Sequence, residues 1–243
     1  MHKREMAEAR ASERGIDRSV DEKGHRNRRR PLKSEPRWPA LLALLALGGL
    51  YAALPTALLV GGPRWLLLLV VSLLLVPAII AQFRGNYSFS QVMGYILNSV
   101  VTVTLIWSLT LLIIALPTRT ITPRQLALAA AMLWVSKILV FAAWYWRLDA
   151  GGPHERDLTP GHNDGAFLFP QMTMTPAAKT AAGEQDWSPN FIDYLFLAFN
   201  ASTAFSPTDV MVLSRWAKVL IMIQALISLL VIALLAARAV SII

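Results

Sequence analysis

The sequence predicts an all-α, polytopic helical membrane protein with five to six membrane segments, of which the last two are a short re-entrant helix and a full span. Three observations predict this class. The 243-residue chain is 55% hydrophobic with a mean hydropathy of +0.48. Its apolar residues gather into long blocks, which is typical of membrane spans. The blocks lack the alternation of barrel strands, so they should cross lipid as helices.

The first 37 residues are predicted to be a basic, disordered, cytoplasmic segment. They carry twelve Lys and Arg residues against seven Asp and Glu residues. Such a segment buries too little apolar surface to fold alone, and its positive charge favours the cytoplasmic side. A second interpretation is a polybasic tether to anionic lipid. Nucleic acid is not an expected partner, because aromatic residues do not interleave with the charges.

Residues 38–147 are predicted to form four transmembrane helices, and a further apolar run ends the chain. Each run reaches the length of about 20 residues that a helix needs to cross a bilayer. Pro55 is expected to kink the first helix, and residues 61–64, Gly-Gly-Pro-Arg, form a tight turn to the second. Thr122 and Pro123 suit the N-cap and first turn of the fourth. The five runs are 38–60, 65–83, 91–117, 124–146 and 213–243.

Lys137 stands out because it lies in the middle of the fourth predicted span. An ammonium at that depth costs at least about 2.5 kcal/mol, so it should face protein or water. The spans offer no obvious carboxylate partner. Three interpretations stay open: a functional charge, a structural hydrogen-bonded lysine, and a lysine that snorkels to the interface. Plausible neighbours on the third span are Asn98, Thr102, Thr104 and Ser108.

Residues 148–189 are predicted to form a long polar loop, and loops of this length are usually functional or disordered. Its centre carries an apolar patch, residues 167–170, with the sequence Phe-Leu-Phe-Pro. This patch either dips into the membrane interface or packs on the spans.

The stretch 191–209 is too short and too interrupted for an ordinary span. Residues 191–203 have helical character, and Ser206-Pro207 stops the helix. Thirteen residues rise about 20 Å, well short of a hydrocarbon core of about 30 Å. Irregular backbone at membrane depth is tolerated only where it is buried in protein or lines water. Residues 190–243 are therefore predicted to form a half-helix, a polar return strand and a full span.

Residues 193–238 resemble the pore module of the potassium-channel superfamily, in which a pore helix precedes a filter and an inner helix. The family's filter pattern is Thr-x-Gly-Tyr-Gly-Asp. Thr203 precedes the filter and Asp209 matches the closing Asp, but the family's glycines, which give its carbonyl filter unusual torsions, are absent. The resemblance therefore implies the architecture without a potassium-type filter. The other five filter positions hold Ala204, Phe205, Ser206, Pro207 and Thr208.

The string Thr-Ala-Phe-Ser-Pro-Thr-Asp also resembles that of a group of uncharacterised bacterial membrane proteins, which supplies no function. The potassium-channel resemblance implies a homo-oligomer, a tetramer, in the cell membrane, with the lipid bilayer and inorganic ions as partners. Phe205 would be a hydrophobic gate, and carboxylates around the axis would favour cations. The ring around that axis would consist of Thr203, Ser206, Thr208 and Asp209.

Gln224 and Ser228 lie four residues apart on one face of the predicted inner helix. They suit a water-lined axis or, equally, interhelical hydrogen bonds. The expected function is thus a weakly selective cation pore. The alternative is a non-conducting membrane scaffold that keeps the shape of the module.

No enzymatic chemistry, cofactor or metal is expected. The chain has no cysteine, which removes thiolate sites and disulfides. Phosphate-binding loops, nucleophile elbows and metalloprotease motifs do not occur in the sequence. Four histidines lie outside the predicted spans without the spacing of metal ligands: His2, His25, His154 and His162.

The side of the membrane that holds residues 148–189 follows from counting spans. With a cytoplasmic N-terminus, four spans return residue 147 to the cytoplasm, so the half-helix would enter from the inside, opposite to potassium channels. We favour this count. The alternatives are an early run that does not cross, or a stretch 191–206 that does.

Overall fold

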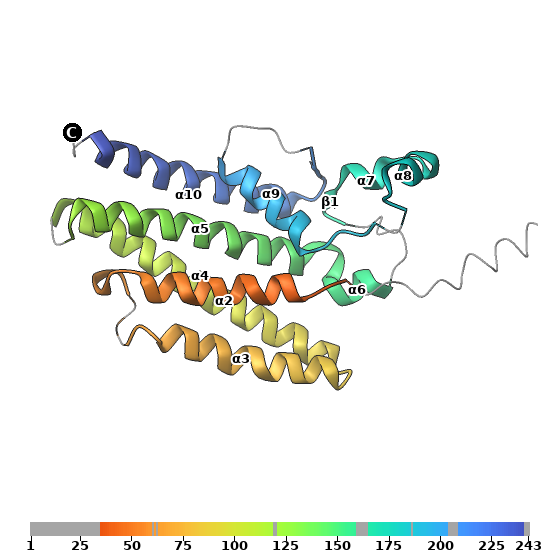
Figure 1. The fold of residues 1–243 in the computed structure, drawn as a ribbon, viewed down its shortest axis with the longest axis horizontal. Coiled ribbons are helices and arrows are strands. Elements are labelled where there is room, and N and C mark those ends of the chain that lie inside the picture. Colours follow the sequence, from red (N-terminus) through yellow and green to blue (C-terminus); the bar gives the residue numbers. More distant parts are fainter. Residues whose placement is uncertain are drawn as a thin grey trace, which may run out of the picture. The chain divides into compact units, whose positions relative to one another are not determined.

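The computed structural model describes residues 35–59, 61, 63–118, 121–158, 165–185, 187–203 and 209–240. Residues 34–243 form one compact unit. Its described part is helical apart from one two-stranded pairing, so the predicted all-α class is confirmed (Figure 1). The predicted basic segment lies, up to residue 34, outside the described residues.

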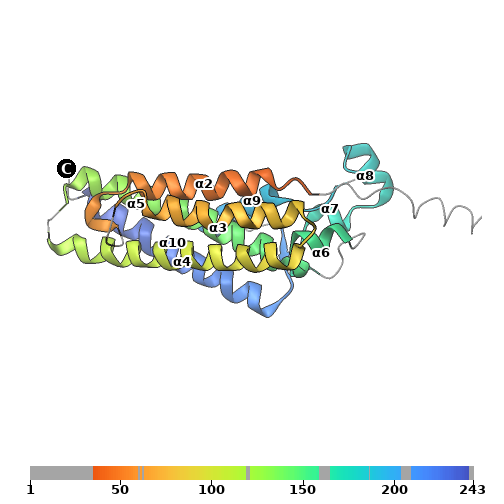
Figure 2. The same cartoon turned by 90° about the horizontal axis from the view of Figure 1, so that it is seen from below.

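Four of the described helices are long and apolar enough to cross a bilayer, as expected of a multi-pass membrane protein. Figures 1 and 2 show them side by side with a fifth, shorter apolar helix, α2 (Trp38–Ala53). The four are α3 (Leu66–Phe83), α4 (Tyr87–Thr118), α5 (Pro123–Leu148) and α10 (Arg215–Val240).

The first apolar run does not continue as one kinked helix. Helix α2 ends at Ala53, and Leu54 is extended at φ −64° and ψ 149°, because the ring of Pro55 disfavours helical torsions in the residue before it. A 3₁₀ turn follows at Thr56–Leu58. The 16 residues of α2 therefore rise only about 24 Å. Pro55 ends the helix instead of bending it.

The turn between α3 and α4 lets α4 begin four residues earlier than the apolar run suggests. Gly85 has φ 75°, a torsion that glycine adopts without a steric penalty. The side chain of Asn86 then accepts a hydrogen bond from the backbone N–H of Phe89 at 3.2 Å, which satisfies one free donor of the first turn. Helix α4 reaches 32 residues.

Helix α5 is the central element of the unit, since it packs on α2, α4, α9 (Phe191–Thr203) and α10. Its start is the predicted one: the Thr122 side chain accepts from the Gln125 N–H at 3.3 Å, and Gln125 caps Thr122 in return. One apolar core lies between α2, α3, α4 and α5. A second lies between α5, α9 and the strands.

The predicted polar loop contains short elements at one end of the bundle (Figure 1). Strand β1 (Phe167–Leu168) pairs antiparallel with β2 (Met211–Val212), with Phe167 opposite Val212. Phe167 is buried, and its ring lies 5.3 Å from the ring of Tyr145 on α5. The apolar patch therefore packs on the helices. A 3₁₀ turn and three helices complete the segment: Asp149–Gly151, α6 (Pro153–Leu158), α7 (Pro170–Thr173) and α8 (Pro176–Ala182).

Candidate functional site

Helices α9 and α10 begin at the same end of the bundle. The Phe167 ring lies 6.1 Å from the ring of Tyr194, in the first turn of α9, and 6.0 Å from the ring of Trp216, in the first turn of α10. At the other end of α9, the backbone carbonyl of Ser202 accepts a hydrogen bond from the hydroxyl of Ser228. The last turn of α9 therefore lies beside the middle of α10.

Gln224 is the centre of a polar core between α5, α9 and α10. Its amide nitrogen donates to the Ala198 carbonyl and to the Ser202 hydroxyl, both at 2.6 Å. Its amide oxygen accepts from the Tyr145 hydroxyl. Gln224 is fully buried, so each of these bonds satisfies a group that lipid could not satisfy. One side chain thus connects three helices.

Ser228 extends this polar core by one turn. Its hydroxyl donates to the Ser202 carbonyl and accepts from the indole N–H of Trp134 on α5 at 3.0 Å. Ser228 is 1% exposed. The two residues that the sequence singled out on α10, Gln224 and Ser228, are therefore brought together, and both face neighbouring helices of the same chain.

Lys137 lies in the same polar core and is fully buried. Its ammonium donates to the Gln224 carbonyl on α10 at 3.4 Å. This bond reaches α10 and not the residues expected on the third span, two of which bond elsewhere: Thr102 accepts from Trp144, and Ser108 donates to the Leu58 carbonyl. Within the described ranges, ion pairs occur at Arg37 and Arg156 and not at Lys137.

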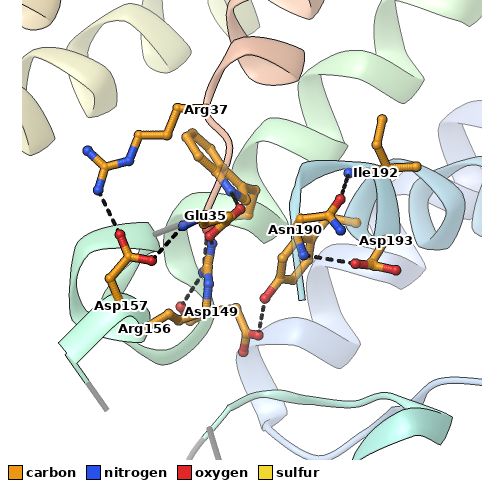
Figure 3. Close-up of polar contacts among 10 residues, drawn as sticks. Glu35, Arg37, Asp149, Arg156, Asp157, Asn190, Ile192 and Asp193 are labelled. Carbon is orange, nitrogen blue, oxygen red and sulfur yellow. Dashed lines mark hydrogen bonds and ion pairs between the residues drawn. The ribbon is translucent and has the colours of Figure 1, made fainter. Parts of the chain in front are cut away.

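A second polar cluster lies at the end of the bundle where α9 begins (Figure 3). The carboxylate of Glu35, just before α2, forms an ion pair of 2.9 Å with Arg156 of α6, and both side chains are buried. Glu35 also accepts from the indole N–H of Trp146. Burial raises the pKa of the Glu35 carboxyl above its ordinary value, and the Arg156 guanidinium and the Trp146 N–H offset part of that rise.

Asp149 connects this cluster to α9. Its carboxylate accepts from the Tyr194 hydroxyl at 2.6 Å and from the Ala166 N–H at 2.5 Å. The Arg156 guanidinium lies 5.1 Å from the centre of the Tyr194 ring, which is a cation–π contact. The same guanidinium donates to the Asp149 carbonyl at 3.0 Å. The ends of α5, α6 and α9 are thus held together.

The start of α9 is set by its own side chains, which are drawn in Figure 3. The Asn190 side chain accepts from the Ile192 N–H, and the Asp193 carboxylate accepts from the Asn190 N–H, both at 2.8 Å. This reciprocal capping satisfies N–H groups that the first turn leaves free.

The predicted filter is described only at its two ends. Thr203 is half-buried, and its hydroxyl donates within α9, to the carbonyls of Phe199 and Asn200 at 3.3 and 3.1 Å. Asp209 is exposed and lies two residues before β2, at the end where α9 begins. The five positions between them, Ala204, Phe205, Ser206, Pro207 and Thr208, lie outside the described residues.

Several residues of both clusters were not identified from the sequence. No sequence pattern marks Tyr145 or Ser202 as a partner of Gln224, and only the packing of three helices brings them together. Glu35 and Arg156 lie 121 residues apart, which no local pattern links. Within the described ranges, His, Asp and Glu side chains do not gather into a group of three that could hold a metal ion.

Comparison with known proteins adds no identity. No protein-family model, no curated protein and no solved structure matches the chain.

Proposed function

We propose that the chain is an ion-channel-like integral membrane protein, and that residues 191–240 form its channel-like module. In this module α9 is a re-entrant half-helix, the chain is back at the side of entry at β2, and α10 spans the membrane. With α2 to α5 as four further crossings, the N-terminus and the entry to the module share one side, which the charge of residues 1–37 makes the cytoplasm of the cell.

One observation carries this proposal: α9 and α10 start together but end at different depths. Ser228, the partner of the last turn of α9, lies 13 residues after Arg215, and α9 itself has 13 residues. Both distances correspond to about 20 Å of helix, against a hydrocarbon core of about 30 Å. This agreement supports entry and return through the same face of the bilayer.

The position of Asp209 supports a charged mouth. Its exposed carboxylate lies beside β2, at the end where α9 enters. In a symmetric assembly, such as the tetramer that the family resemblance suggests, the carboxylates would form a ring that attracts cations.

A second candidate, a non-conducting scaffold of the same shape, is favoured by a specific observation. Gln224 and Ser228 are used within the chain to bind α9 and α5, so they are not free to line an axis. The exposed residues of α10 around them are apolar: Met222, Ile223, Leu226, Leu229 and Leu230.

Recordings from the purified chain in planar bilayers distinguish the two candidates. A channel-like protein should give unitary currents under potassium, sodium or chloride gradients, and Asp209→Asn should shift the reversal potential toward lower cation preference. Absence of currents under all three gradients would favour the scaffold. Currents with a reversal potential that Asp209→Asn leaves unchanged would reject the carboxylate ring but keep the conducting module.

A further inference from the structure

A cavity of about 250 Å³ is lined by residues of α2, α3, α4, α5 and α6 and of the segment just before α2. The part of its wall at the helix ends, here called the outer wall, includes Arg37, just before α2, Arg147, at the end of α5, and His154, at the start of α6. Its inner wall includes Leu44, Leu75 and Ala78. Leu44 lies six residues inside α2, which corresponds to a depth of about 9 Å.

Arg147 lies beside this cavity without an anionic partner. Among the described residues, carboxylates pair with Arg37, through Asp157 at 3.1 Å, and with Arg156, through Glu35. The Arg147 guanidinium is half-buried and forms no ion pair or hydrogen bond within the described part of the chain. It lies 5.3 Å from the centre of the Trp146 ring. A guanidinium withdrawn from water without an acceptor is unfavourable.

The backbone of α4 makes room for this guanidinium. A Cβ atom added at Gly94 would lie 1.8 Å from Nη1 of Arg147, so glycine is what allows the approach. The nearby stack of Tyr87 on His154, with ring centres 3.8 Å apart, holds the start of α6 against α4 beside the cavity. The guanidinium is thus positioned by packing.

The depth of the cavity suits the boundary between head groups and acyl chains. Trp38 and Phe83, at the ends of α2 and α3, are 63% and 87% exposed, and exposed aromatic residues at helix ends are typical of the membrane interface. The volume is below the range of about 300–1,000 Å³ that encloses a drug-sized ligand. A head group and the beginning of an acyl chain would fit, with the rest of the chain in the bilayer.

We propose that this cavity binds an anionic glycerophospholipid. The phosphate accepts hydrogen bonds from Arg147, whose planar guanidinium suits bidentate contact with phosphate. The first methylene groups of an acyl chain lie against Leu44, Leu75 and Ala78. Since Asp157 neutralises Arg37, the Arg147 charge supplies the selection for an anionic lipid, as in other basic pockets between membrane helices.

Lipid retention tests the proposal. The full chain is reconstituted in vesicles of phosphatidylcholine and phosphatidylglycerol, extracted in mild detergent, and its bound lipid is counted by native mass spectrometry. The wild type should be enriched in phosphatidylglycerol. Arg147→Gln should lower that enrichment about tenfold, through loss of a charge-assisted contact. Arg84→Gln is the matched control, because exposed Arg84 directly follows the cavity-lining Phe83 and does not itself line the cavity.

Two further variants keep the test decisive if Arg147→Gln does not fold. Ala78→Leu leaves the Arg147 charge in place but fills part of the cavity beside its apolar wall, so it should lower lipid retention as well. Arg147→Lys keeps the positive charge, so this variant should retain part of the phosphatidylglycerol enrichment. Equal phosphatidylglycerol retention in wild type, Arg147→Gln and Ala78→Leu would overturn the site. Displacement of the lipid by millimolar inorganic phosphate would also overturn it, because the ligand would then be phosphate alone.

Discussion

Glu35 and Arg156, 121 residues apart, form a buried ion pair of 2.9 Å. The pair places the start of α2 and the segment after α5 at the same end of the bundle. Between these residues the chain runs through α2, α3, α4 and α5, so it traverses the bundle an even number of times. This relationship argues against an early run that does not cross, and it makes the ion pair the first target for mutation.

Loss of Arg156 should destabilise the unit strongly. Arg156→Met leaves the Glu35 carboxylate buried without its partner, which typically costs about 3–5 kcal/mol. The expected result is a large fall in the thermal unfolding temperature in detergent. Arg37→Gln is the matched control, since the Arg37–Asp157 pair is more exposed and should contribute less than about 1 kcal/mol. Similar losses for both variants would contradict the prediction.

The Arg156→Met variant should also change the dependence of stability on pH. Burial raises the pKa of Glu35 in the folded state, and Arg156 opposes that rise, so the variant should have a folded-state pKa still further above the unfolded one. A raised folded-state pKa favours folding with the proton bound. That contribution is complete below the unfolded-state pKa and is lost as pH rises through the folded-state pKa.

The stability gap between wild type and Arg156→Met should therefore be smallest at acidic pH and widen toward neutral pH. Unfolding curves recorded across this range measure it. The double variant Glu35→Gln/Arg156→Met has no carboxyl at position 35, so the difference between its stability and that of the wild type should not widen toward neutral pH. A pH-independent gap for the single variant would argue against a buried, unpaired Glu35.

Gln224 should be the most sensitive residue of α10. Gln224→Leu removes two donors and one acceptor and leaves the Tyr145 hydroxyl and the Ala198 carbonyl without that partner. An unsatisfied buried group costs about 1–3 kcal/mol, and the loss should appear in equilibrium unfolding. Met222→Leu, an exposed substitution on the same helix, should have almost no effect. Equal stability of the two variants would mean that Gln224 is not bonded as described.

Lys137 can be tested for a purely structural role. Its ammonium makes one long contact, to the Gln224 carbonyl at 3.4 Å, which compensates little of the cost of burying a charge. Lys137→Met should therefore leave stability unchanged or raise it. In that case the buried ammonium would not contribute to stability, which would argue that its charge has a functional role. A fall in stability of more than about 1 kcal/mol would instead identify the ammonium as a structural donor.

Accessibility of single cysteines should place α6 and α8 on one side of the membrane and the α2–α3 turn on the other. The chain has no cysteine, so Glu155→Cys, Thr180→Cys and Gly61→Cys give no background with an impermeant thiol reagent. With a cytoplasmic N-terminus, Gly61→Cys should react in intact cells, and the other two only after the membrane is opened. The reverse pattern would show that the module has the potassium-channel orientation.

The sequence was sufficient where the physics is local. Apolar runs predict the positions of α3, α5 and α10, and Thr122 predicts the first turn of α5, because a cap depends on neighbours three residues away. The length of α9 follows from the residues around it. The expected kink at Pro55 is wrong, because the helix ends there. The local sequence around a proline that ends a helix does not differ from that around a proline that kinks one.

The candidate sites depend on long-range packing. Lys137, Gln224 and Ser228 were recognised as polar residues in apolar surroundings, but periodicity could not show that they meet between α5 and α10. The Glu35–Arg156 pair had no sequence indication, because its members lie in segments that read as a disordered tail and a polar loop.

The different lengths of α2 and α4 affect the hydrocarbon thickness of the bilayer around the protein. The 16 residues of α2 rise about 24 Å, and the 29-residue candidate span Tyr87–Ala115 of α4 rises about 44 Å. A flat hydrocarbon layer of about 30 Å is too thick for the first and too thin for the second. Tilting and local thinning accommodate such mismatch. Longer lipid tails would reduce the mismatch at α4 but increase it at α2. The bilayer is therefore expected to be thinner beside α2 than beside α4, whatever its lipid composition.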